Sequence, residues 1–529
     1  MQGKKQYSEK LFSHFQLSER VPKENFYRKL RDQLDLKFLY QATSQLYGGT
    51  GNPSIDPVVF FKLMLVGYLE NITSDRKLIE HCSMRMDILF FIGYDIDEEL
   101  PWHSTVSRTR QLYDEKLFEE LFSKVFTLCV ESGLVSGHTQ AVDSAYIKAN
   151  ASMDSIEKKI PAQEIRDFLN ESEKENLPVR QAGFTPLRKA KENKASDEQK
   201  TISSTEKELQ ELDTRNKRFE EKKIEQHGSK VEKTFQSFSN QTHYSPTDPD
   251  ARISTKPGKP RQLNYLCSMS VDTAKGVISH VQADFADKKD SRYTMDIATK
   301  TKNELKKNNF ILENILADTG YSSGINYHEL EKENITAYIP TSGVYKHERE
   351  GFIYNKEEDY FTCRNNKKII HKKTYTNKAG GLMKSYRSSV KDCRGCPFKK
   401  ECIGEKAQAK KFELSFYQEE YERAYNRQQT KHFKRMVKLR HGTIEPVFGS
   451  LINYYGLRKV NVKGKVGAHK CMLMSAIAYN LKKLMKFYQR KRNSSVIAMQ
   501  GELCTFAKTL FYGFISFDIP HPDFALTKR

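Results

Sequence analysis

Three acidic residues stand where they could build a site for metal-dependent phosphodiester cleavage. Asp143 lies inside the alternating run HTQAVDSAYIK, Asp318 closes the short apolar run ILENILAD, and Glu445 opens an apolar helical pattern. If the first two runs are strands of one sheet, acids 175 residues apart can meet at one sheet edge. Carboxylates of this kind can hold two Mg²⁺ ions about 3.5–4 Å apart, which activate an attacking oxygen and stabilise the leaving one.

Glu445 has the most informative surroundings of the three. It lies in HGTIEPVFGSLINYYG, where Thr443 is expected to cap a helix whose first turn holds Glu445 and Pro446. Apolar residues then recur at helical spacing and are expected to pack on the sheet. Because an unpaired carboxylate among apolar neighbours is costly, a metal ion or an arginine is expected to compensate it.

The positive charge of the chain is concentrated in two segments. The chain has a net charge of +21, and residues 421–490 hold 16 Lys and Arg against two acids, a net charge of +14. Residues 361–410 contribute a net charge of +11. A local basic surface interleaved with tyrosines favours double-stranded DNA as partner, the alternative being a solvated basic face. The residues predicted to contact DNA are Lys434, Arg435, Lys438, Arg440, Arg458 and Lys459.

The elements that must position these residues can be outlined from periodicity. Residues 57–134 read as helices, with Ser104 or Thr105 as a cap for a helical run that continues to residue 133. After the strand that holds Asp143, the runs at 261–272 and 276–285 read as two strands joined by a tight turn. A helix, a strand, a helix and a strand follow up to residue 340. This order predicts a ribonuclease H-like mixed α/β sheet with flanking helices.

Two polar segments interrupt the predicted sheet domain. Residues 150–245 are rich in Lys and Glu and indicate a helical insertion, and residues 341–415 indicate a Cys-rich, zinc-ribbon-like insertion. The predicted organisation is therefore a helical DNA-binding module, a catalytic domain in two parts with the insertion between them, and a tail. Their bounds are 1–136, 137–340, 341–415, 416–490 and 491–529.

A cluster of cysteines marks a second candidate metal site. Cys393 and Cys396 form a CxxC pair, and Cys363 and Cys402 are the nearest other thiols. Four thiolates suit tetrahedral structural Zn²⁺, the alternative being reduced cysteines without a metal. The other cysteines stand in apolar surroundings and are predicted to be core residues: Cys82, Cys129, Cys267, Cys471 and Cys504.

Membrane and secreted locations are not expected. No stretch approaches the ~18 uninterrupted apolar residues of a membrane helix. The first residues, MQGKKQYSEKLFSHFQ, lack the apolar core of a secretory signal. We therefore expect a cytoplasmic protein associated with the nucleoid.

Several motifs, taken in order, resemble the DDE transposases of bacterial insertion sequences, in the insertion-sequence-four-like superfamily. They are AVDSAYIKANAS at 141–152, TDPDARIS at 247–254, ADTGYSSG at 317–324, and TIEPVFG at 443–449 with AIAYNLKKL downstream. The helical stretches IDPVVFFKLMLVGYLENITSDRKLIEHC and PWHSTVSRTR resemble the N-terminal module of that family. The resemblance spans roughly residues 50–488.

The resemblance implies a ribonuclease H-like catalytic domain, Mg²⁺ dependence, and a catalytic triad at Asp143, Asp318 and Glu445. We expect Mn²⁺ to substitute for Mg²⁺, and a homo-oligomer to form in the synaptic complex with element ends and target DNA. Where the family usually has Arg and Lys around the glutamate, this chain has His441 and Ile452.

Two other functions stay open from the sequence. One is a transposase-derived DNA-binding protein that lacks catalysis, and the other is a ribonuclease H-like nuclease without strand transfer.

Overall fold

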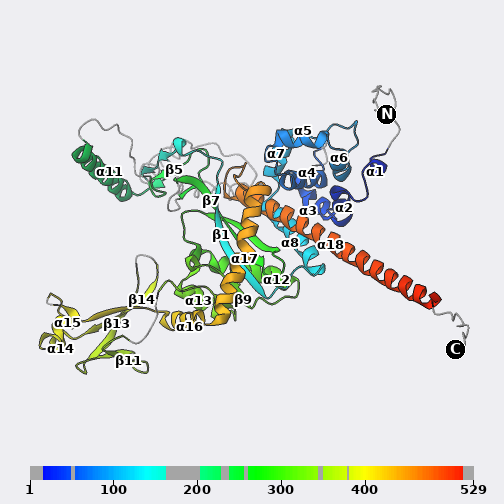
Figure 1. The fold of residues 1–529 in the computed structure, drawn as a ribbon. Helices are drawn as coiled ribbons and strands as arrows, with labels where there is room; N and C mark the ends of the chain where they lie inside the picture. Colours follow the sequence, from blue (N-terminus) through cyan, green and yellow to red (C-terminus); the bar gives the residue numbers. More distant parts are fainter. Residues whose placement is uncertain are drawn as a thin grey trace, which may run out of the picture.

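The computed structural model describes residues 16–48, 54–161, 203–227, 238–254, 260–343, 349–377, 380–404 and 406–515. Its architecture is mixed α/β and has three parts, the third of which is inserted into the sequence of the second (Figure 1). An all-helical region comes first, a mixed sheet flanked by helices lies at the centre, and a second sheet projects from that centre.

The N-terminal region is helical, as predicted, but its helices are shorter. The run predicted from Ser104 or Thr105 begins instead at His103, and it breaks because Asp114 caps a new helix by accepting the backbone N–H of Leu117 at 3.1 Å. The elements are α1 (Leu17–Arg20), α2 (Phe26–Gln33), α3 (Phe38–Thr43), η1 (Ser44–Leu46), α4 (Pro57–Leu69), α5 (Asp75–Ser83), α6 (Met86–Ile92), α7 (His103–Leu112) and α8 (Glu115–Glu131).

The central sheet confirms the predicted ribonuclease H-like class. Its strands are β1 (Thr139–Lys148), β6 (Arg252–Ser254), β7 (Gln262–Asp272), β8 (Ile278–Phe285), β9 (Asn314–Leu316) and β10 (Thr336–Tyr338). The order is β10-β9-β1-β7-β6, with β8 also paired to β7. β7 runs antiparallel to β1 and β8, whereas β9 is parallel to β1 and β10 is parallel to β9.

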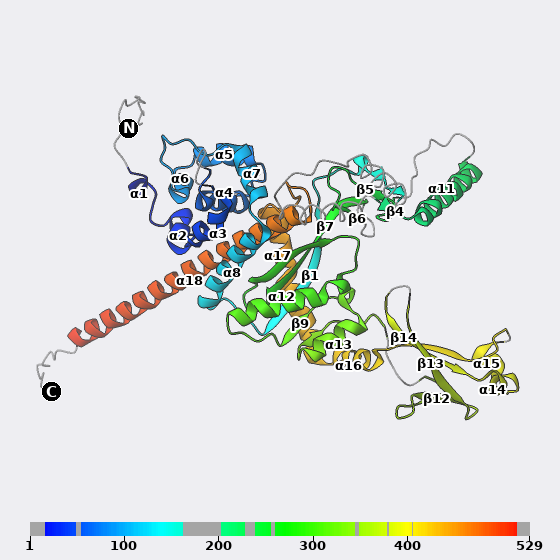
Figure 2. The same ribbon diagram turned by 180° about the vertical axis from the view of Figure 1, so that it is seen from behind.

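Helices cover both faces of this sheet. α12 (Thr294–Lys307) packs on β7 and β8, and α17 (Lys431–Tyr454) packs on β1. α17 lies in front of the sheet in Figure 1, and α12 lies in front of it in the reverse view of Figure 2. α13 (Gly324–Lys332) and α16 (Gln418–Gln428) pack together beside β10. The strands are therefore buried on both faces, which explains why β7 is almost wholly apolar or small.

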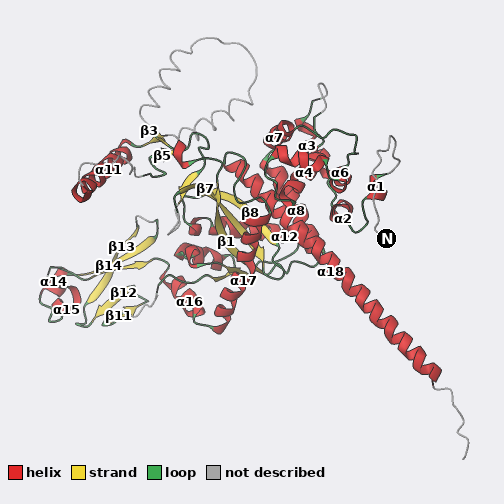
Figure 3. Ribbon diagram, turned by 45° about the horizontal axis from the view of Figure 1, so that its top comes forward, coloured by secondary structure: helices red, strands yellow, loops and turns green. Residues whose placement is uncertain are grey.

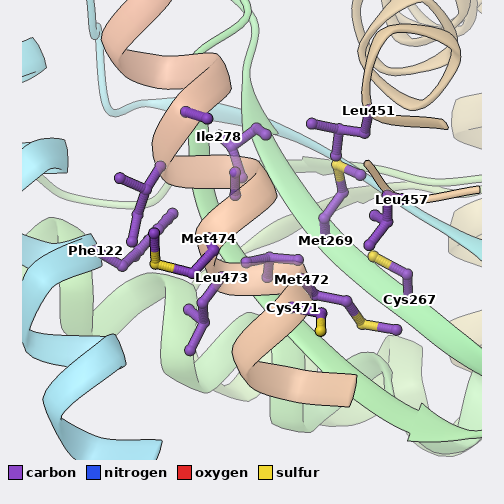
Figure 4. Packing of buried hydrophobic residues seen from close by; sticks show 14 of the residues in the cluster. Phe122, Cys267, Met269, Ile278, Leu451, Leu457, Cys471, Met472, Leu473 and Met474 are labelled. Atoms are coloured by element: carbon purple, nitrogen blue, oxygen red, sulfur yellow. The ribbon is translucent and has the colours of Figure 1, made fainter. Parts of the chain in front are cut away.

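Helix α18 (Lys465–Ile515) joins the helical region to the sheet, because it packs on α4, α8 and β8. Figure 4 shows its residues Cys471–Met474 among Phe122 of α8 and Met269 and Ile278 of the sheet. Cys82, Cys129, Cys267 and Cys471 are buried, as predicted, whereas the side chain of Cys504 lies outside the described residues. α18 then runs past the rest of the chain (Figure 3), so most of the predicted tail continues a helix up to Ile515.

The two predicted insertions, one helical and one Cys-rich, agree with the structure to different degrees. The predicted long polar helix is α11 (Glu206–His227), and residues 162–202 lie outside the described part. Small elements surround it: η2 (Met153–Ser155), β2 (Glu157–Lys158) paired with β5 (His243–Tyr244), and β3 (Ile160–Pro161) paired with β4 (Ser203–Ser204).

The Cys-rich segment holds an antiparallel sheet that the sequence analysis did not predict. Its strands, in spatial order, are β11 (Phe352–Asn355), β12 (Tyr360–Cys363), β13 (Lys368–Thr376), β14 (Leu382–Ser388) and β15 (Lys411–Ser415), with α14 (Val390–Arg394) and α15 (Lys399–Ile403) between the last two. Its own core is small: Phe361, Ile369, Tyr386, Phe412 and Leu414. A core of this size gives little stability by itself.

Helix α17 corrects the prediction that Thr443 begins a helix. The helix begins at Lys431 behind Thr430, whose hydroxyl accepts the N–H of Phe433. Thr443 is buried in mid-helix and donates its hydroxyl to the Leu439 carbonyl. Pro446 stands inside this helix, where it lacks the N–H that would otherwise bond the Gly442 carbonyl.

Gly137, just before β1, gives a first testable prediction. Its φ is +78°, and a β-carbon there would lie 2.3 Å from the Phe310 ring. Gly137→Ala should therefore lower the free energy of unfolding by roughly 2–5 kcal/mol, measured by denaturant titration. Gly133→Ala is the control, because its φ of +77° is similar but nothing lies within 4 Å of the added carbon. Equal losses in both variants would contradict a role for the close approach to Phe310.

Candidate active site at the sheet edge

Asp143 lies in β1, opposite Met269 of β7. Its Oδ1 accepts the backbone N–H of Ser144 at 2.8 Å, and its Oδ2 accepts the guanidinium of Arg440 at 2.9 Å. The side chain is 20% exposed. Burial raises the pKa of Asp143, and the negative charge of Asp318 adds to this effect. The guanidinium of Arg440 therefore stabilises the charged form of this buried carboxylate.

The register between β1 and β9 brings Asp318 to the same edge of the sheet. The two strands are parallel, with Ala141 opposite Leu316, so Asp143 and Asp318 each follow this pair by two residues. Asp318 caps the short helix η4 (Thr319–Tyr321), because its Oδ1 accepts the N–H of Gly320 at 2.8 Å. The sheet therefore places these two carboxylates side by side, as the sequence predicted.

A buried tyrosine links the two strands behind these acids. The Tyr321 side chain is fully buried, and its hydroxyl hydrogen-bonds the Ser144 hydroxyl at 2.5 Å. Since Ser144 follows Asp143 and Tyr321 ends η4, this bond ties the backbone around Asp143 to the backbone around Asp318. Burial raises the pKa of Tyr321 far above its ordinary value, so the phenol stays protonated and can keep this bond.

Glu445 reaches the site from α17, but it is not buried. Its side chain is 57% exposed, so the expectation of a carboxylate enclosed by apolar neighbours is wrong. Nδ1 of His441, one turn earlier in the helix, is hydrogen-bonded to Oε1 of Glu445 at 2.5 Å. Arg440 lies 4.0 Å from the same oxygen. The spacing of four residues between His441 and Glu445 is the signal from which this pair could have been foreseen.

Arg440 connects helix α17, on which it lies, to strand β1. Its side chain is 8% exposed, and its guanidinium lies 2.9 Å from Asp143 and 4.0 Å from Glu445. The sequence predicted a DNA-contacting role for this residue, whereas the structure places it among the acids. A cation thus stands between the carboxylates of β1 and α17.

The site offers carboxylate oxygens, which are the donors that hard divalent cations prefer. Two of these carboxylates, Asp143 and Glu445, already attract the guanidinium of Arg440. As the side chains lie, no three His, Cys, Asp or Glu groups among the described residues are close enough to hold one metal ion. In this arrangement Glu445 is engaged by His441, and Arg440 lies beside Asp143 and Glu445.

Asp290 is an acidic neighbour of Asp318 that does not belong to the predicted triad. A β-carbon on Gly320 would lie 3.0 Å from Asp318 Oδ1 and 3.2 Å from Asp290 Oδ2. The two carboxylates therefore flank one point. Nothing in the spacing of the sequence marks Asp290, because it belongs to η3 (Asp290–Arg292), in the connection between β8 and α12.

The other predicted DNA-contacting residues lie on the surface. Lys434, Arg435 and Lys438 are exposed on α17, and Arg458 and Lys459 are exposed in the connection to α18. Arg435 and Lys438 line a groove of about 670 Å³ between α17, α18 and the turn after β7. Lys275 and Lys483 line the same groove, so its walls carry four basic side chains. Such a groove suits a phosphate backbone.

The clustered cysteines meet in the projecting sheet. Cys363, Cys396 and Cys402 line a cavity of about 210 Å³, together with Phe352 and Phe398. Cys393 lies beside them, with its Sγ 3.1 Å from the hydroxyl of Ser388. Burial raises the pKa of Cys402, and the other three thiols are close enough to add to this effect. Thiolates are donors that suit zinc, but as these side chains lie, no three of the described thiols are close enough to hold one metal ion.

Comparison with protein families gives two matches. Residues 15–112 match the family described as Transposase domain (DUF772), and residues 362–485 match the family described as Transposase DDE domain. The second range contains Glu445 and the four clustered cysteines, whereas Asp143 and Asp318 lie outside both ranges. No curated protein matches the chain. None of the described helices is both long and apolar enough to cross a membrane.

Proposed function

Because this chain is a DDE transposase of insertion-sequence type, we propose that it cleaves DNA strands at the ends of its element and joins them to target DNA. Asp143, Asp318 and Glu445 hold two Mg²⁺ ions in this proposal, and Mn²⁺ can replace them. The observation that carries it is the meeting of β1, β9 and α17 at one edge, where Arg440 spans Asp143 and Glu445 at 2.9 and 4.0 Å.

When bound, the ions activate the attacking oxygen and stabilise the leaving oxygen of the phosphodiester. The residues of the chain fix the geometry. Tyr321 and Ser144 hold the backbone of β1 against η4, so that Asp143 and Asp318 keep their separation. Glu445 lies on a helix that can carry it toward them. Water attacks the phosphodiester at the element end and displaces the 3′ oxygen, and the freed 3′ hydroxyl then attacks a phosphate of the target strand and displaces the 3′ oxygen of that strand at the same site.

DNA binding is assigned to the exposed basic residues of α17 and of the connection after it. Lys434, Arg435, Lys438, Arg458 and Lys459 contact the phosphates of double-stranded DNA, at the nucleoid in the cytoplasm, and Arg440 serves the acid cluster instead. Since two element ends must be held together for joining, the protein works as a homo-oligomer in the synaptic complex.

The projecting sheet is proposed to be stabilised by one Zn²⁺ ion held by Cys363, Cys393, Cys396 and Cys402. The small core of this sheet and the cavity that three of these thiols line support the assignment.

The proposal is tested with a labelled duplex that carries an end of the element and an unlabelled target duplex. Incubation with Mg²⁺ should give a nick at the end and then a joined product, both resolved on denaturing gels. With Ca²⁺ the DNA should be bound but not cut, because Ca²⁺ is larger and less strict in geometry. Cleavage without joining would support the nuclease, and binding without cleavage would support the non-catalytic DNA-binding protein.

Salt dependence tests the assigned DNA surface. Six to ten phosphate contacts should cost ~10³–10⁵ in affinity between about 50 and 200 mM salt. Replacing Lys434, Arg435 and Lys438 with Glu should weaken binding and flatten the logarithmic salt slope by up to about 3, measured by fluorescence anisotropy.

A matched control keeps the same change in net charge. Arg215, Lys217 and Arg218 are exposed on α11, away from the site, and the same reversal there should leave the slope near that of the wild type. If both triple variants lose equal slope, the effect is one of net charge and α17 is not the contact surface.

A further inference from the structure

The projecting sheet is strongly basic. Residues 361–410, which include β13 and β14, have a net charge of +11. The small core of the sheet lies on one of its faces, because Phe361 is opposite Ile369 and Tyr386 is opposite Phe412. Since side chains alternate along a strand, the neighbouring residues point to the other face. Basic side chains can therefore gather on a face that the core does not use.

A groove of about 680 Å³ lies on this second face. Four exposed basic side chains line it, which are Lys372 and Lys373 of β13, Arg387 of β14 and Lys411 of β15. The register agrees with this placement, because Arg387 is opposite Lys411, one position along from the core pair. None of the described residues that line the groove is acidic. The groove is therefore a local concentration of positive charge.

An irregularity in β13 brings two adjacent lysines to the groove. His371 is opposite Tyr386 of β14, but Lys373, two residues later, is opposite Ser385, only one residue earlier. Lys372 is thus the extra residue of a β-bulge. In a regular strand Lys373 would share the core face with His371, because side chains alternate. The bulge instead turns Lys373 to the second face, so that both lysines line the groove.

The positive charges of the groove are only partly balanced within the chain. Lys411 pairs with Glu413 of the same strand. Lys372, Lys373 and Arg387 form no ion pair with any acid in the described part of the chain. Arg387 also stands directly opposite Lys411, and like charges in opposite positions destabilise a sheet. A bound polyanion would relieve this repulsion.

The lining of the groove favours the backbone of duplex DNA over a single strand. Surfaces for single strands combine positive charge with aromatic side chains on which the bases stack. No aromatic side chain is among the described residues that line this groove. Small and polar residues such as Ser385 and Gln408 complete it instead. Lys, Arg, Ser and Gln side chains contact phosphates well, and such contacts carry no sequence information.

We propose that the groove of Lys372, Lys373, Arg387 and Lys411 is a second DNA-binding surface, which holds the phosphate backbone of double-stranded DNA whatever its sequence. The inference rests on the proposed function, because that function supplies DNA as the partner. It adds a surface apart from α17, and it gives the projecting sheet a role in binding.

Fluorescence anisotropy with a labelled duplex tests this surface in the full-length protein. Replacing Lys372, Lys373 and Arg387 with Gln should weaken binding by about 10-fold or more and flatten the logarithmic salt slope by up to about 3. The loss should be the same for a duplex with an element end and for one of unrelated sequence, because only phosphates are contacted. Arg387→Lys, which keeps the charge, should keep the wild-type slope.

A matched control lies on the same sheet outside the groove. Lys367, Lys391 and Arg394 are exposed and do not line the groove, so replacing them with Gln makes the same change in net charge. This variant should keep a slope near that of the wild type. Limited proteolysis of residues 349–415 shows whether each sheet is folded. If the groove variant is cut there, Arg387→Gln against Arg394→Gln carries the comparison, with an expected difference in slope of about 1.

Equal slopes in the groove variant and its control would overturn the proposal, as would a single strand that competes as well as the duplex. In either case, loss of binding on reversal of Lys434, Arg435 and Lys438 would leave the proposed function intact. A wild-type protein that binds no duplex DNA would refute both the second surface and the proposed function.

Discussion

Asp318→Asn should leave a protein that binds DNA but hardly cuts it. The substitution keeps the size of the side chain and its ability to accept the Gly320 N–H, so η4 should stay in place. It removes one negative charge from the proposed metal ligands. Since altering outer-shell partners of a metal already costs 10–100-fold, the loss of a direct ligand should slow cleavage by more than about 100-fold. Cleavage of a labelled element end and anisotropy with the same DNA measure the two properties separately.

Glu445→Gln should behave in the same way, and Asp287→Asn should cleave at the wild-type rate. Asp287 is a suitable control, because its carboxylate pairs with Arg252 at 3.8 Å and does not belong to the triad. Wild-type cleavage by Asp318→Asn would refute the mechanism. A wild-type protein that binds DNA but is inert with both Mg²⁺ and Mn²⁺ would favour the non-catalytic alternative.

The sequence was sufficient to predict five of the six strands of the central sheet, all except β6, because their signals are local. Asp143 lies in an alternating run and Asp318 closes a short apolar run, and helix α12 precedes the strand that ends before Asp318. The meeting of Asp143 and Asp318 at one edge could therefore be foreseen. The long helix α11 was foreseen for the same reason, because its charged pattern is continuous.

Features that depend on tertiary contacts could not be predicted from local sequence patterns. The position of Thr443 looked like a helix cap, but the helix continues through it because Thr443 packs inward and bonds back to Leu439. Arg440 looked like one more basic residue of α17 and is instead buried against Asp143. Asp290 carries no motif, and only the packing of η3 on η4 brings it to Asp318.

The projecting sheet was missed for a different reason. Its longest strand, β13, is rich in Lys and Thr, and a single small cluster of apolar residues forms its core. The alternation of apolar and polar residues that indicates a strand is weak in such a segment. The cysteines were the visible signal, and they indicated a site without indicating the sheet that supports it.

Replacing Cys393 and Cys396 with Ser should release about one zinc ion per chain and unfold the projecting sheet. Structural zinc supplies an apparent ~10–16 kcal/mol in zinc-finger peptides, which is more than a five-residue core can provide. Metal analysis of protein purified without chelator should find about one zinc in the wild type and none in the double variant. Limited proteolysis should then cut the variant within residues 349–415 while the central sheet stays protected.

Arg394→Ser is the matched control, because Arg394 is exposed between the two cysteines and its loss leaves all four thiols. This variant should keep its zinc and its resistance to protease. A chelator added to the wild type should reproduce the cuts of the double variant, since both remove the same ligand interactions. Wild-type protein that carries no zinc, or a double variant that resists protease as well as Arg394→Ser does, would show that the sheet is held by its own core.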